Sequence, residues 1–69
     1  MTQKELAYME DAIGHESNII KILQESLKNT QNEEINKFLE NELSEHVKQK
    51  EQLINKLEEK ANVWSTING

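Results

Sequence analysis

Two glutamates and a histidine are spaced so that, in a bundle of helices, their side chains would lie at the same height along the helix axes. Glu16 stands where an apolar residue is expected in a heptad row, and His46 stands in the corresponding row of the second half of the chain. Glu42 precedes His46 by four residues, which places both on one helix face. A carboxylate within an apolar row needs a partner. We therefore expect Glu16 to face His46 across a helical hairpin.

Two interpretations of this polar level stay open. Carboxylates and imidazole together are donors that iron or manganese accepts, and a second copy of the chain would double the set within one core. Glu16, Glu42 and His46 are therefore candidate metal ligands. The alternative needs no cofactor, because a Glu–His pair can simply fix the register of two helices, which polar residues in a bundle seam commonly do.

The elements that must position these residues are two amphipathic helices. Thr2 and Glu5 have capping-box spacing, and they precede a row with alternating steps of three and four residues: Leu6, Met9, Ile13, Glu16, Ile20, Leu23 and Leu27. This pattern predicts a helix over about residues 3–28. A polar turn over 29–32 follows, and Thr30 and Glu33 offer a second capping box. The second helix is predicted over about 33–63, with the row Ile35, Leu39, Leu43, His46, Leu53, Leu57, Ala61 and Trp64.

A short polar turn predicts that the two helices lie antiparallel. The fold prediction is therefore one all-α domain over residues 1–69, an antiparallel two-helix hairpin. A chain of 69 residues with only two helices leaves its apolar rows partly uncovered, so we expect pairing with a second copy into a four-helix bundle. We also expect Val63, Trp64 and Ile67 to extend past the start of the first helix and to pack on the partner chain.

Composition excludes several classes of function. The chain has no cysteine, so a disulfide partner and thiol chemistry are excluded. Its net charge is −5 and all eight cationic residues are lysine, which argues against nucleic acid and anionic membrane surfaces as partners. No basic segment leads into a long apolar run, so we expect neither a signal peptide nor a membrane span, and a cytoplasmic location.

Other polar residues suggest no catalysis. His15 follows Asp11 by four residues, the spacing of a solvated pair on a helix surface. Lys50 lies in the second row, where its stem can pack while its ammonium reaches water. The serines have no base and acid arranged around them. We therefore expect a non-catalytic protein.

Three stretches, Tyr8 to Glu16, Thr30 to Ile35 and Leu39 to His46, resemble small spore coat F-like proteins and, more distantly, one half of a ferritin-like or rubrerythrin-like bundle. The similarity covers roughly residues 4–60. It implies a self-associating structural protein of the cytoplasm or the spore coat. The alternative that it implies is a ferritin-like di-iron or di-manganese protein whose site forms between two hairpins.

The ferritin-like pattern takes one Glu from the first helix of each hairpin and a Glu-x-x-His pair from the second. Glu16 and His46 fall at the positions of the first Glu and of the His. Leu43 stands where the second Glu belongs, and Glu42 is one residue further away from His46.

A third possible function is that of a regulatory helical partner, which would exchange its own dimer for a helix of another protein.

Overall fold

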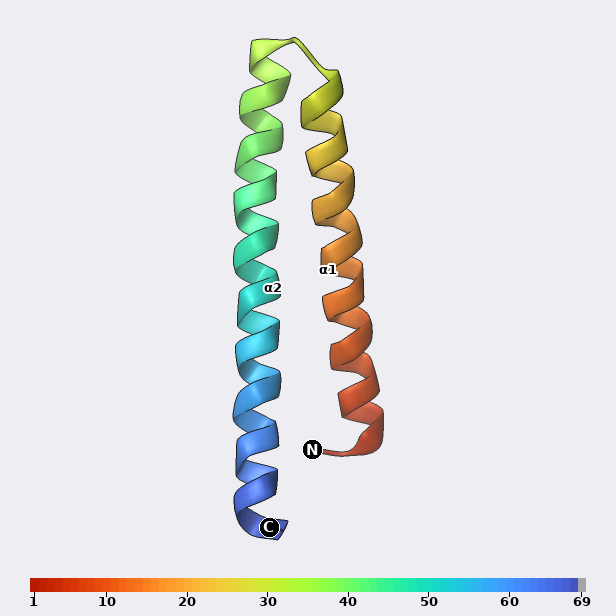
Figure 1. Cartoon of the computed structure of the whole chain (residues 1–69), viewed down its shortest axis with the longest axis vertical. Coiled ribbons are helices and arrows are strands. Elements are labelled where there is room, and N and C mark those ends of the chain that lie inside the picture. Colours follow the sequence, from red (N-terminus) through yellow and green to blue (C-terminus); the bar gives the residue numbers. More distant parts are fainter. Residues whose placement is uncertain (69) are drawn as a thin grey trace.

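The computed structural model is a hairpin of two helices (Figure 1). Helix α1 spans Gln3–Asn29 and helix α2 spans Glu33–Asn68. The structure describes residues 1–68, and it describes the side chains of residues 1–61. The prediction of an all-α hairpin is confirmed. Helix α2 continues beyond the predicted end near residue 63, because neither proline nor glycine occurs between residues 33 and 68.

The predicted capping box at the start of α1 is confirmed. The Thr2 hydroxyl accepts a hydrogen bond from the Glu5 N–H at 3.0 Å, and the Glu5 carboxylate accepts one from the Thr2 N–H at 2.9 Å. Two backbone donors that α1 cannot satisfy internally thus find partners. The sequence therefore determines where α1 begins.

The predicted second capping box, with Thr30 as its first residue, is wrong. Thr30 has extended backbone angles and ends α1, with its N–H donating to the Ser26 carbonyl at 3.1 Å. Asn32 caps α2 instead, because its side-chain oxygen accepts the Ile35 N–H at 3.1 Å. The Thr30 hydroxyl accepts the Asn32 N–H at 3.4 Å and so stays within the turn. Asparagine is among the best N-cap residues, which favours this choice.

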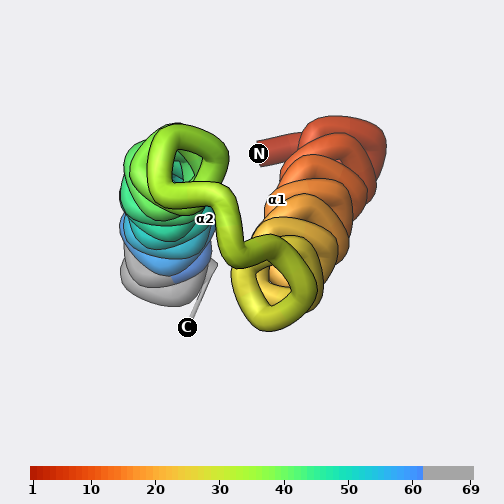
Figure 2. The backbone as a smooth tube through the Cα atoms, turned by 90° about the horizontal axis from the view of Figure 1, so that it is seen from above, coloured from red at the N-terminus to blue at the C-terminus, as the bar shows by residue number. Residues whose placement is uncertain are grey.

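The two helices lie side by side in opposite directions, with inclined axes that Figure 2 shows from above. Partly covered side chains face each other along them, and we call these residues the seam: Met9, Ile13, Glu16, Ile20, Leu23 and Leu27 of α1 with Leu39, Leu43, His46, Lys50, Leu53 and Leu57 of α2. Among residues 1–61, no side chain is fully buried. A single layer of two helices leaves both of its faces open.

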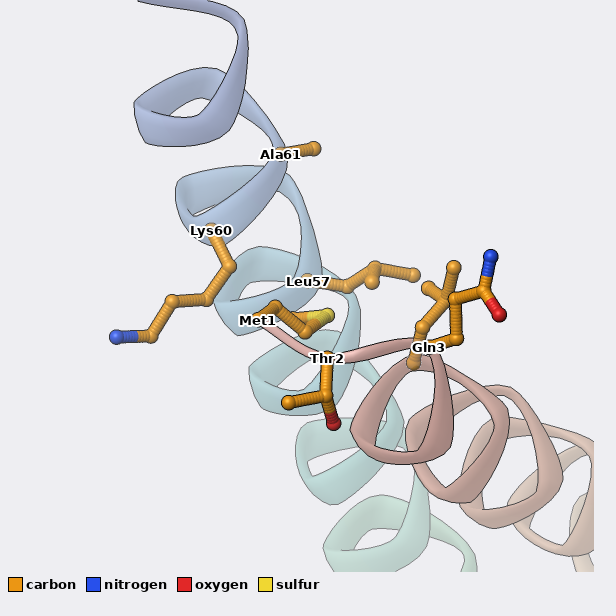
Figure 3. A pocket seen from close by; sticks show the side chains of 7 residues that line it. Met1, Thr2, Gln3, Leu57, Lys60 and Ala61 are labelled. Carbon is orange, nitrogen blue, oxygen red and sulfur yellow. The ribbon is translucent and has the colours of Figure 1, made fainter. Parts of the chain in front are cut away.

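The hairpin is widest at the end opposite the turn. There a hollow of about 360 Å³ lies between the start of α1 and α2, lined by Met1, Thr2, Gln3, Leu6, Leu57, Lys60 and Ala61. Figure 3 shows the Met1 side chain beside Leu57, and the Lys60 ammonium directed away from both. The expected packing of Val63, Trp64 and Ile67 lies outside the described side chains. Within the described residues, neither helix has an apolar stretch long enough to cross a membrane.

Candidate functional site

The polar contact between the helices joins Glu16 of α1 to His46 of α2. The Nδ1 atom of His46 lies 2.6 Å from Oε2 of Glu16, and the side chains are 14% (Glu16) and 21% (His46) exposed. The structure thus brings together the two residues that the sequence places at one level. An imidazole N–H that donates to the carboxylate satisfies both groups.

The apolar residues around Glu16 explain why its carboxylate needs a hydrogen-bond donor from α2. Ile13 and Ile20 flank Glu16 at heptad spacing, and both are half-buried. This apolar setting removes water from most of the Glu16 side chain, so the carboxylate depends on a protein donor. His46 supplies that donor from the middle of the α2 row, between Leu43 and Leu53.

Glu42 approaches the other nitrogen of the same imidazole. Its Oε2 atom lies 3.7 Å from Nε2 of His46, and its side chain is 42% exposed. This separation is too long for a hydrogen bond and allows only an electrostatic contact. The imidazole can donate toward both carboxylates only in its protonated form. The three candidate residues therefore converge on one ring, but from opposite sides of it.

This arrangement does not let all three side chains bind one metal ion. An ion about 2.1 Å from both a nitrogen and an oxygen holds those atoms about 3 Å or more apart. The 2.6 Å contact of Glu16 with His46 is shorter than that, whereas the 3.7 Å gap between Glu42 and Nε2 is wide enough. In the described part of the chain, no group of three or more His, Asp or Glu side chains is placed to hold a metal.

The remaining polar candidates do not extend the site. His15 is exposed, and no ion pair joins it to Asp11 in the described part of the chain. Lys50 is half-buried in the seam. Asn36 is a residue that the sequence analysis missed, because its side-chain oxygen is buried without a hydrogen-bond partner. Asn36 precedes Leu39, Leu43 and His46 in steps of three and four residues. This spacing could have placed Asn36 on the same face of α2 as those residues.

The Glu16–His46 contact can thus tie the two helices together, and Glu42 adds a longer electrostatic contact to the same ring. Comparison of the chain with known protein families, curated proteins and solved structures finds no match. The similarity to spore coat F-like and ferritin-like proteins therefore stays a prediction from the sequence.

Proposed function

We propose that this chain is a non-catalytic structural and interaction protein whose hairpins associate with one another as helical bundles. One observation carries the proposal: the seam is rich in leucine and isoleucine, yet none of the described side chains is fully buried. A stable fold normally removes its apolar side chains from water. A second hairpin laid on an open face would complete that burial.

The exposed area supports association quantitatively. The hairpin exposes 5639 Å², whereas a compact monomer of 8.1 kDa exposes only about 4,500 Å². The excess, about 1,100 Å², is larger than the roughly 800 Å² that each partner contributes to an interface of standard size. A homodimer in the form of a four-helix bundle, or a larger assembly, fits this excess.

Within this proposal, the Glu16–His46 contact has a structural role. It favours one register of the helices, because a slip would leave a partly buried carboxylate without its donor. The similarity to spore coat proteins supports a role in such a coat, with the cytoplasm as the place of synthesis. No cofactor is needed for this role.

Sedimentation equilibrium of the purified chain tests the proposal. We expect a dimer or a larger species at micromolar concentration, and a stable, fully helical monomer there would refute it. Leu23→Asp should abolish both association and folding, because an unpaired charge enters the seam. Gln24→Asp is the matched control, since it adds the same charge at an exposed position of the same helix.

A second candidate function is a ferritin-like protein that binds iron or manganese between two hairpins. The observation that favours it is the wide gap between Nε2 of His46 and Oε2 of Glu42. Metal-binding histidines usually donate their other ring N–H to a carboxylate, and Glu16 is placed to accept that hydrogen bond. In this function Glu42 and His46 would be ligands, Glu16 would orient the imidazole, and a second hairpin would supply further donors.

A further inference from the structure

Helix α1 carries a second row of side chains beside the seam. Tyr8, Ala12, His15, Ile19, Ile22 and Ser26 follow one another in steps of four and three residues, and we call them the outer row. At about 100° per residue, this row lies roughly 40–120° around the helix from Glu16. Tyr8 is 62% exposed and Ile22 is 64% exposed. An apolar row with heptad spacing is the pattern of a helix that contacts a second neighbour.

Helix α2 offers no equivalent row on the same side of the hairpin. A second hollow, lined by Met1, Glu5, Tyr8, Met9, Lys56 and Lys60, shows that the Tyr8 side of α1 and the Lys56 side of α2 coincide. Counting back along α2 from Lys56 in steps of four and three residues, this side carries Gln52, Gln49, Glu45 and Glu42, followed by Phe38 and Ile35 nearer the turn. Away from the turn, the uncovered apolar surface on this side therefore belongs mainly to α1, whereas Phe38 and Ile35 of α2 add to it near the turn.

We propose that the outer row of α1 packs against the outer row of a second copy, with the two α1 helices antiparallel. This inference rests on the proposed self-association and specifies which helix and which register it uses. Placing α1 against α2 of the second copy, with both turns at one end, would instead bring Ile19 opposite Glu42 and Tyr8 opposite Gln52. Tyr8 and Ile19 then meet polar residues, and only Ile22 meets an apolar one, Phe38, whereas the antiparallel α1 pair brings Tyr8 and Ile19 together.

Charge fixes the register of this pair. Lys4, Asp11, Asn18 and Glu25 flank the outer row at intervals of seven residues. When Lys4 of one copy lies opposite Glu25 of the other, Asp11 lies opposite Asn18, and no like charges meet. The same register brings Tyr8 against Ile19 of the second copy. A shift by one heptad would bring Asp11 opposite Glu25 twice, which is unfavourable.

Disulfide trapping tests the register directly, because the natural chain has no cysteine. In a Tyr8→Cys/Ile19→Cys variant the two sites are about 16 Å apart along one helix, too far to form a bond within a chain. We expect covalent dimers to form in this variant at least tenfold faster than in Ala12→Cys/Ile22→Cys, which reports the shifted register, or in Ile22→Cys/Phe38→Cys, which reports α1 against α2. Equal or reversed rates would overturn the inference.

A charge swap gives an independent measurement. Lys4→Glu and Glu25→Lys should each weaken the dimer about tenfold, since two opposite-charge pairs become like-charge pairs. The double variant should return the dissociation constant to within about threefold of the original. Lys37→Glu, an equal charge change at an exposed site on α2, should leave it unchanged. If the original chain dimerises but the double variant does not regain its affinity, the proposed register is wrong and the proposed self-association stands. If the original chain is monomeric, the proposed function itself is wrong.

Discussion

His46 and Glu16 are thirty residues apart in the chain and are joined by a 2.6 Å contact between the middles of the two helices. This contact links the first helix to the second at a level where the surrounding seam is aliphatic. A polar pair in such a place contributes to register as much as to stability, because other alignments leave both groups without partners.

A double-mutant cycle measures that contribution. Glu16→Leu and His46→Leu should each lower the free energy of unfolding by about 1–2 kcal/mol, since each leaves its partner partly buried and unpaired. The double variant should be as stable as the original or more stable, because a packed apolar pair avoids the cost of desolvating polar groups. Urea denaturation followed by circular dichroism supplies the four values. Additive losses in the double variant would show that the contact contributes little.

The two helices and the Glu16–His46 pair could be predicted from sequence because both depend on local periodicity and on the position of the turn. The cap of α2 could not, since Thr30 and Asn32 are both good capping residues and the geometry of the turn decides between them. Glu42 also lies beside His46, but its carboxylate approaches Nε2, whereas Glu16 contacts Nδ1. Periodicity sets a residue's level and face, not the atom that it contacts.

Gly14 is a site where the hairpin tolerates a larger residue. A Cβ atom added there meets nothing within 4 Å, and the backbone conformation is ordinary helix. Gly14→Ala should therefore raise the free energy of unfolding by about 0.5–1 kcal/mol through helix propensity. Thermal unfolding detects the change, and Ala7→Gly on the same helix is the reverse control. A loss of stability in Gly14→Ala would indicate that another chain approaches α1 closely at this point.

The capping box predicts a pH dependence at the start of α1. Hydrogen bonds from Thr2, with the backbone N–H first, lower the pKa of the Glu5 carboxyl from its ordinary value of 4.5. The folded state thus favours the ionised form. Its stabilising effect is complete above the ordinary pKa and is lost as the pH falls through the lowered pKa. Glu5→Gln should reduce amide protection in the first turn at pH 7, and the difference should disappear in acid. A difference that persists in acid would exclude ionisation as its cause.

Metal binding decides between the two candidate functions. We expect Fe(II), Mn(II) and Zn(II) to leave the melting temperature unchanged, because Glu16 already occupies Nδ1 of His46 and only the Glu42 side of the ring leaves room for an ion. The measurement compares the original chain with His46→Ala and Glu42→Gln at equal metal concentrations.

If the protein is instead a ferritin-like metal-binding protein, the same measurements should give a different pattern. A ferritin-like site would bind one or two ions per dimer and raise the melting temperature by mass action. Both effects would be lost in His46→Ala and weakened in Glu42→Gln. Glu16→Gln distinguishes the roles within such a site, because an orienting residue changes affinity about 10–100-fold without changing the number of ions bound. Tight binding with this pattern would make Glu42 and His46 ligands and would replace the structural interpretation of the pair.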